Sequence, residues 1–154
     1  MATYAAHAVV KLRHQSSLCK RMRVGIRTGM FNANQPRYAN GALCELPYPT
    51  DDTRAITVAA IAGLDRIYRD GYAYSKAEIL LVDLRQHGQY TDDLFSTAQP
   101  QSSDRLMGVM DKINERWGSG TIRHGRVPIA PEWGMNRELM SQCFTTRIDY
   151  LWRV

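Results

Sequence analysis

A strand has to end and a helix has to begin within the nine residues LPYPTDDTR at 46–54. Proline lacks an amide hydrogen for a β-ladder and biases the preceding residue away from the α region. Pro47 and Pro49 therefore predict that a strand ends near Leu46. The residues that follow can cap a helix N-terminus and complement its dipole; they are Thr50, Asp51 and Asp52. The stretch is thus a predicted strand-to-helix junction.

The segments on either side of this junction show helical and strand periodicities. Apolar stripes predict helices over 3–15 and 51–69, and alternation or a short apolar run predicts strands over 19–28, 38–46 and 75–85. The first two strands would form a hairpin with a long, turn-rich loop. The order helix–strand–strand–helix–strand predicts an α+β fold, an antiparallel-rich sheet with two helices on one face.

One predicted strand, CKRMRVGIRT at 19–28, carries opposite chemistry on its two faces. Successive side chains of a strand point to opposite sides. The apolar side chains on one side are Met22, Val24 and Ile26. The basic side chains on the other are Arg21, Arg23 and Arg27, with Gly25 among them. We expect a half-buried strand with one open, basic face.

The charge of the chain is concentrated at one end. Residues 1–44 contain seven basic side chains and no acid, because the first acid is Glu45. The rest of the chain has 13 basic and 15 acidic residues. A concentrated positive surface is either a solvated face or a contact for a polyanion, most often a nucleic acid.

The chain shows no recognisable catalytic motif. It lacks the phosphate-binding, nucleophile-elbow, HExxH and CxxC patterns, and the histidines are scattered at His7, His14, His87 and His124. The cysteines are odd in number and widely spaced, which favours reduced thiols over disulfides or zinc, at Cys19, Cys44 and Cys143. The residues alone indicate a binding module with no cofactor and no metal.

Residues 87–154 differ in composition from the residues before them. Residues 87–103 are polar and turn-rich, which predicts a linker after a first domain at 1–86. Leu94 and Phe95 are an isolated apolar pair in this linker, either packed back on the domain or offered to a partner. A helix is predicted over 104–117. A unit as small as 104–154 has to pack on the first domain or stay loosely ordered.

The composition favours a soluble, cytoplasmic protein. The chain has 154 residues, of which 44% are apolar, enough for one domain or two very small ones. No apolar run approaches the roughly 20 residues that span a bilayer. The N-terminus lacks the pattern of a signal peptide.

Several motifs together resemble one known family. The stretch ELPYPTDDTRAITVAAIAGLDRIYRDGYAYSKAEILLVDL is similar to the C-terminal part of UmuC-type Y-family translesion polymerases, the catalytic subunits of bacterial DNA polymerase V. The upstream VVKLRHQSSLCKRMRVGIRTGMFNANQPRYAN resembles the first helix and basic strand of the same domain. The downstream DRLMGVMDKINERWGSGTI, IAPEWGMNRELMS and FTTR resemble the small C-terminal extension of these proteins.

The resemblance implies that residues up to about 86 form a little-finger domain, which lays a sheet along template-primer DNA. The side chains expected at phosphates are Lys20, Arg21, Arg23, Arg27 and Arg37. Contacts of this kind position a protein on DNA without reading bases. The polymerase core and its metal-binding carboxylates have no counterpart here, so we expect a DNA-binding fragment that is not itself an enzyme.

The chain departs from the family pattern in two places that affect function. The family domain has a strand before its first helix, so the sheet here is expected to lack that strand and to have an open edge. The family linker often carries a sliding-clamp peptide, and the matching stretch keeps only its last two residues, Leu94 and Phe95. Weak clamp binding is therefore expected at this pair.

Two further interpretations remain open from the sequence. The linker and extension would form a protein-interaction module that docks a sliding clamp, a recombinase filament or an accessory mutagenesis subunit. Alternatively, the chain is a non-functional remnant of a truncated gene. Loss of DNA binding when Arg21, Arg23 and Arg27 are reversed to Glu would favour the DNA-binding fragment over the interaction module and the remnant.

Overall fold

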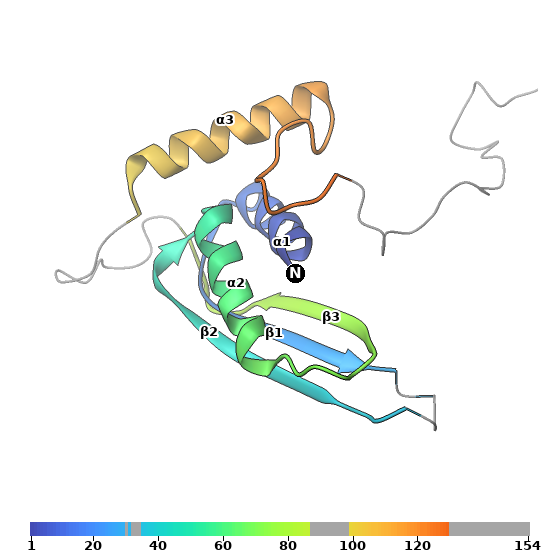
Figure 1. The fold of residues 1–154 in the computed structure, drawn as a ribbon. Helices are drawn as coiled ribbons and strands as arrows, with labels where there is room; N and C mark the ends of the chain where they lie inside the picture. Colours follow the sequence, from blue (N-terminus) through green and yellow to red (C-terminus); the bar gives the residue numbers. More distant parts are fainter. Residues whose placement is uncertain (30, 32–34, 87–98, 130–154) are drawn as a thin grey trace, which may run out of the picture.

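The computed structural model of this chain describes residues 1–29, 31, 35–86 and 99–129, and its elements are arranged in two layers (Figure 1). In chain order the helices and strands are α1 (Ala2–His14), β1 (Ser17–Thr28), β2 (Ala39–Thr50), α2 (Thr53–Ile67), β3 (Tyr74–Leu81), β4 (Leu84–Gln86) and α3 (Gln101–Trp117). The predicted α+β class and the predicted order of the first five elements are confirmed.

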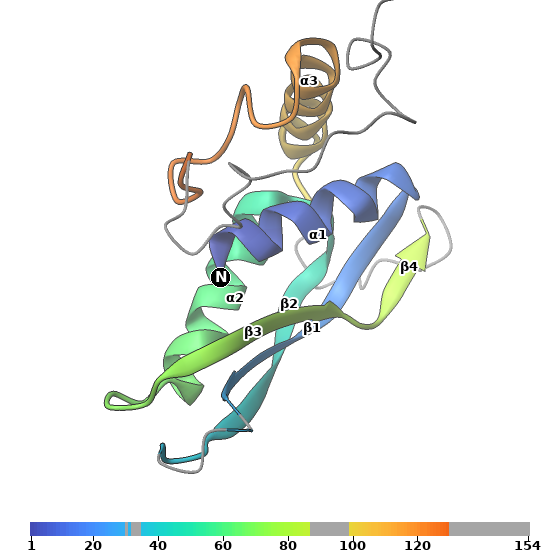
Figure 2. The ribbon, with the colours of Figure 1, turned by 90° about the vertical axis from the view of Figure 1, so that its right-hand side faces the viewer.

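The sheet is antiparallel and is built around β1 (Figure 2). β1 pairs with β2 on one side and with β3 on the other, and β4 pairs with the beginning of β1. The outer edge of β3 pairs with no other strand among the described residues. This agrees with the open edge expected from the sequence.

The core lies between the sheet and the helix layer. α1 and α2 cover one face of the sheet, and the inward side chains of β1 contact both. The most deeply buried of these apolar side chains are Val9, Leu12, Met22, Val24, Leu46 and Ile56. α2 approaches β2 closely at Gly63, where an added Cβ would overlap the sulfur of Cys44. The opposite face of the sheet is left uncovered by the helices.

The predicted strand end near Leu46 is wrong, because β2 continues through both prolines to Thr50. The register explains this: Arg21 faces Glu45, whereas Cys19 already faces Thr50, so the prolines lie in an irregular, widened part of an edge strand. Proline is tolerated at sheet edges and bulges, where its missing N–H removes no ladder bond.

The predicted helix cap is confirmed. Asp52 is the N-cap of α2, and its carboxylate accepts a hydrogen bond from the backbone N–H of Arg54 at 2.8 Å. Burial would raise the pKa of this carboxyl, but hydrogen bonds from Arg54 and Ser103 outweigh it and the pKa lies below its ordinary value. Asp52 is therefore ionised where helix α2 needs an anion.

The last strand of the sheet is divided differently from the prediction over 75–85. β3 and β4 are separated by Val82 and Asp83, but two backbone hydrogen bonds to Arg21 and Lys20 bridge the gap. Pairing along β1 is thus nearly continuous.

The predicted helix at 104–117 is confirmed as α3, which begins three residues earlier and lies against the helix layer (Figure 1). Leu94 and Phe95, with the rest of 87–98 and 130–154, lie outside the described residues.

Candidate nucleic-acid interface

The open face of the sheet carries the arginines of β1. The side chains of Arg21 and Arg23 are 49% and 55% exposed, and Arg27 is also exposed. The alternating residues Met22 and Val24 are fully buried against the helices. The predicted division of this strand into a basic face and a core face is confirmed.

The register adds side chains from the neighbouring strands to the same face. Residues directly opposite each other on paired strands point to the same side of a sheet. Arg27 lies between Ala39 of β2 and Lys76 of β3. Alternation within SKAEILLVDL could have placed Lys76 on a face, but only the pairing with Arg27 shows which face it shares. Lys76 is thus a candidate phosphate contact that the sequence reading missed.

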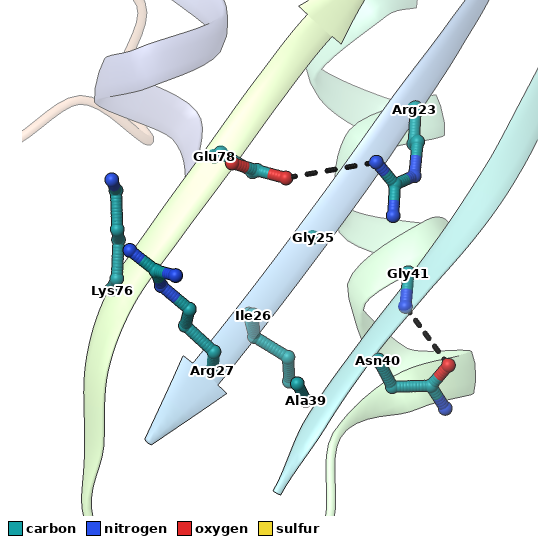
Figure 3. A pocket seen from close by; sticks show the side chains of 9 residues that line it. All are labelled: Arg23, Gly25, Ile26, Arg27, Ala39, Asn40, Gly41, Lys76 and Glu78. Carbon is teal, nitrogen blue, oxygen red and sulfur yellow. Dashed lines mark hydrogen bonds and ion pairs between the residues drawn. The ribbon is translucent and has the colours of Figure 1, made fainter. Parts of the chain in front are cut away.

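The side chains of Arg23 and Glu78 lie over two glycines of the sheet, Gly25 and Gly41 (Figure 3). A Cβ at Gly25 would come within 2.9 Å of the Glu78 side chain, and one at Gly41 would come within 3.0 Å of the Arg23 guanidinium. The two glycines therefore let these long side chains lie across the sheet. They form a shallow groove of about 550 Å³ whose other charged lining residues are Arg27 and Lys76.

The ion pairs on this face are long and exposed. Arg23 and Glu78 approach to 3.9 Å, and both side chains are 55% exposed. Arg21 approaches Glu45 at 3.7 Å and Asp83 at 4.0 Å. Exposed pairs of this kind contribute little to stability, about 0–1 kcal/mol, so a phosphate can replace the carboxylate at modest cost.

Two cations of the face are available without breaking an ion pair. Within the described part of the chain, neither Arg27 nor Lys76 forms one. The ion pairs and register of this face bring together four cations, Arg21, Arg23, Arg27 and Lys76, and three carboxylates, Glu45, Glu78 and Asp83, so cations exceed carboxylates.

The remaining predicted contacts lie apart from the groove. The ammonium of Lys20 donates to the carbonyl oxygens of Leu46 at 2.7 Å and Pro47 at 3.1 Å, which ties β1 to the irregular part of β2. Arg37 is exposed in the segment that leads into β2. The role of Lys20 and Arg37 at phosphates stays a prediction. Leu94 and Phe95 lie outside the described residues.

Aromatic side chains near the start of β2 were not anticipated from the sequence. Tyr38 and Tyr72 stack at 4.8 Å between ring centroids, and the guanidinium of Arg69 lies 5.2 Å from the Tyr38 ring centroid. The hydroxyl of Tyr38 donates to the Ile67 carbonyl at 2.6 Å. These contacts join the end of α2 to the start of β2.

The described residues contain no group of three or more histidine, cysteine or acidic side chains placed to hold a metal ion.

Burial raises the pKa of the Cys19 thiol to about 11, so it is protonated at neutral pH and is a poor nucleophile. None of the helices in the described ranges is long and apolar enough to cross a membrane. The geometry of the open face suits binding of an extended anion.

Comparison with known proteins identifies two family units in the chain. The impB/mucB/samB family C-terminal domain matches residues 1–94, and a domain of unknown function (DUF4113) matches residues 104–154. The first match extends into the predicted linker at 87–103, and the division into 1–86, 87–103 and 104–154 stays a prediction.

Curated relatives match over nearly the whole chain. Protein UmuC of Salmonella typhimurium strain LT2 is 38% identical over 153 residues, covering 99% of this chain and 36% of the relative. Protein ImpB and Protein SamB of Salmonella typhimurium are 39% and 42% identical over 145 residues, each covering 94% of this chain and 34% of the relative. The chain thus spans about a third of the length of these relatives, and it belongs to the impB/mucB/samB family.

Proposed function

We propose that this chain is the DNA-binding C-terminal part of an error-prone translesion polymerase and that its open sheet face grips the backbone of template-primer DNA. The observation that carries this proposal is the cluster of Arg21, Arg23, Arg27 and Lys76 on one uncovered face, contributed by two paired strands. Adjacent side chains on one face can contact successive phosphates of a strand.

The contacts available favour the backbone over the bases. Arginine and lysine neutralise phosphates and release counterions, which gives affinity that falls steeply with salt and does not depend on sequence. Leu43 and Leu80 lie directly opposite Arg23 and are 59% and 54% exposed. Such apolar side chains fit the sugars between phosphates. Backbone contact of this kind suits a polymerase that has to accept damaged templates.

The proposal assigns binding to this chain and catalysis elsewhere. Nucleotidyl transfer would require a polymerase core and metal-binding carboxylates beyond the third of the relatives' length that this chain spans. The chain would therefore act in the cytoplasm, as the DNA-gripping part of an enzyme of SOS mutagenesis and DNA repair.

The test is binding of the chain to a labelled primer-template duplex, measured by fluorescence anisotropy. We expect Arg21→Glu, Arg23→Glu and Arg27→Glu together to weaken binding by about 100-fold or more, because each reversal removes one phosphate contact and adds a repulsion.

A matched control reverses the same number of charges on the other side of the molecule. Lys11, Arg105 and Lys112 are exposed on α1 and α3, away from the sheet face. Changing these three to Glu should weaken binding far less than the strand reversals. Equal losses in the two triple variants, or no DNA binding by a folded wild type, would overturn the proposal.

Partner docking through the linker is a separate proposal. Leu94 and Phe95 would be the contacts for a sliding clamp, and the extension would be the contact for an accessory subunit or a recombinase filament. Leu94→Ala with Phe95→Ala should then remove clamp binding and leave DNA binding intact. Clamp binding that survives this double substitution would exclude the pair.

A further inference from the structure

The guanidinium of Arg13, at the end of α1, connects three distant parts of the chain. It donates to both carboxylate oxygens of Asp111 in α3, at 2.5 and 2.7 Å. Its remaining terminal nitrogen donates to the carbonyl oxygen of Asp51 and to the hydroxyl of Thr53, both at 2.9 Å. The Arg13 side chain is only 11% exposed. An arginine fork bonded twice to one carboxylate is both strong and specific in geometry.

Further contacts between α3 and the strand-to-helix junction surround this arginine. The guanidinium of Arg54 donates to the Ser103 hydroxyl at 3.0 Å, and Gln99 donates to the Asp51 carboxylate at 2.9 Å. Ser103 is 4% exposed. The first turn of α3 is therefore held at the point where β2 passes into α2.

One apolar side chain on the same side of α3 is also buried. Met107 lies one helical turn from both Ser103 and Asp111, and it is 1% exposed. Ser103, Met107 and Asp111 are spaced at i, i+4 and i+8, so they lie on one side of α3. The side of α3 that bonds Arg13 and Arg54 is therefore its buried side. Leu106, Val109 and Trp117 remain 40–61% exposed.

We infer that α3 docks on the helix layer of the N-terminal domain. The Arg13–Asp111 ion pair is the principal polar contact that holds α3 there. In family terms, the first helix of the DUF4113 unit binds the back of the impB/mucB/samB C-terminal domain within the same chain. This gives that helix a role: it fixes the extension to the domain proposed to hold DNA.

The position of the dock has a consequence for binding. α3 lies on the side of α1 and α2 away from the sheet, while the basic face is on the opposite side of the sheet (Figures 1 and 2). Docked α3 therefore leaves the proposed DNA surface uncovered. DNA binding and docking of α3 are compatible, and neither requires release of the other.

The test is hydrogen exchange of the full chain, followed in peptides that cover 101–117 and, for comparison, peptides from β1. Asp111→Ala removes the Arg13–Asp111 ion pair. Glu115→Ala is the matched control because Glu115 is an exposed carboxylate on the same helix. We expect exchange over 101–117 to rise about tenfold or more with Asp111→Ala and to stay within about twofold of wild type with Glu115→Ala. Exchange in β1 should be unchanged in both.

A second variant tests the docking of α3 in case its other polar contacts hold it in place without Asp111. Met107→Asp places a charge where the side chain is 1% exposed, and it should release α3 at least as strongly. DNA affinity should stay within about twofold of wild type in the Asp111 variant, because distant sites act independently. Wild-type exchange over 101–117 in both the Asp111 and Met107 variants, or an equal rise in Asp111→Ala and Glu115→Ala, would overturn the inference, whatever the DNA result.

Discussion

Arginines lie on both sides of this domain, but they have opposite surroundings. On the open sheet face, Arg21 and Arg23 are about half exposed and their ion pairs span 3.7–4.0 Å. On the helix side, Arg13 is 11% exposed and forms four hydrogen bonds of 2.5–2.9 Å. Arginine is thus used in two ways. All the hydrogen bonds described for Arg13 are made within the chain, whereas Arg21 and Arg23 can exchange their weak ion pairs for contacts with an external anion.

The largest effect should come from breaking the helix side. Arg13→Ala leaves the Asp111 carboxylate and two junction oxygens without their donor, so we expect the free energy of unfolding to fall by about 2–3 kcal/mol. Urea denaturation of the purified chain measures this. Arg27→Ala, the same substitution on the open face, should change stability by less than about 0.5 kcal/mol. Equal losses from the two substitutions would remove the distinction between the two sides.

A smaller effect concerns Asp52, whose carboxylate caps α2 and pairs with Arg54 at 2.7 Å. Asp52→Asn keeps a capping oxygen but removes the charge, so we expect a loss of about 1 kcal/mol at neutral pH. Because the folded pKa of Asp52 lies below its ordinary 3.8, this contribution is complete above that value and is lost as the pH falls through the lower folded pKa. Urea denaturation of both proteins across a pH series from neutral to below 3.8 tests this, and a stability gap that does not narrow as the pH falls below 3.8 would argue against it.

On the open face, loss of a single cation should affect DNA and leave the fold intact. We expect Lys76→Ala to weaken duplex binding about three- to tenfold and to reduce the slope of log affinity against log salt by about 0.9. Fluorescence anisotropy at four salt concentrations gives both numbers. An unchanged slope would remove Lys76 from the set of phosphate contacts.

The smallest change should be a gain. Glu78 competes with DNA phosphates for Arg23, so Glu78→Gln should tighten duplex binding by about two- to fivefold at low salt. Gly25 leaves room beneath residue 78 for the isosteric amide, so stability should be unaffected. Weaker binding in this variant would mean that the carboxylate positions Arg23 instead of masking it.

The local features of the fold could be predicted from the sequence. Alternation in 19–28 placed the arginines and the core residues on their correct faces, and Asp52 was recognisable as a cap. These features depend on neighbouring residues alone. The passage of β2 through Pro47 and Pro49 was not predictable, because it depends on β2 being an edge strand with an irregular register against β1.

The candidate site was predictable only in its central strand. The face that Lys76 and Glu78 share with β1 depends on the pairing of β3 with that strand, which no local pattern specifies. The bonds from the Lys20 ammonium to the carbonyl oxygens of Leu46 and Pro47 could not be predicted from the sequence, and the role of Lys20 at phosphates stays a prediction. The bond from Arg13 to Asp111 joins residues 98 positions apart, and only the packed structure shows it.

If the open-face cations bind phosphates, the salt dependence of wild-type binding to a primer-template duplex shows it most directly. Four contacts, from Arg21, Arg23, Arg27 and Lys76, predict a slope of log affinity against log salt of about −3 to −4. The triple reversal of the three arginines should bring that slope to about −1, the share of Lys76 alone. The Lys11, Arg105 and Lys112 reversal should leave the slope unchanged. A wild-type slope near zero, or a slope lost only with the helix-side reversals, would contradict the account.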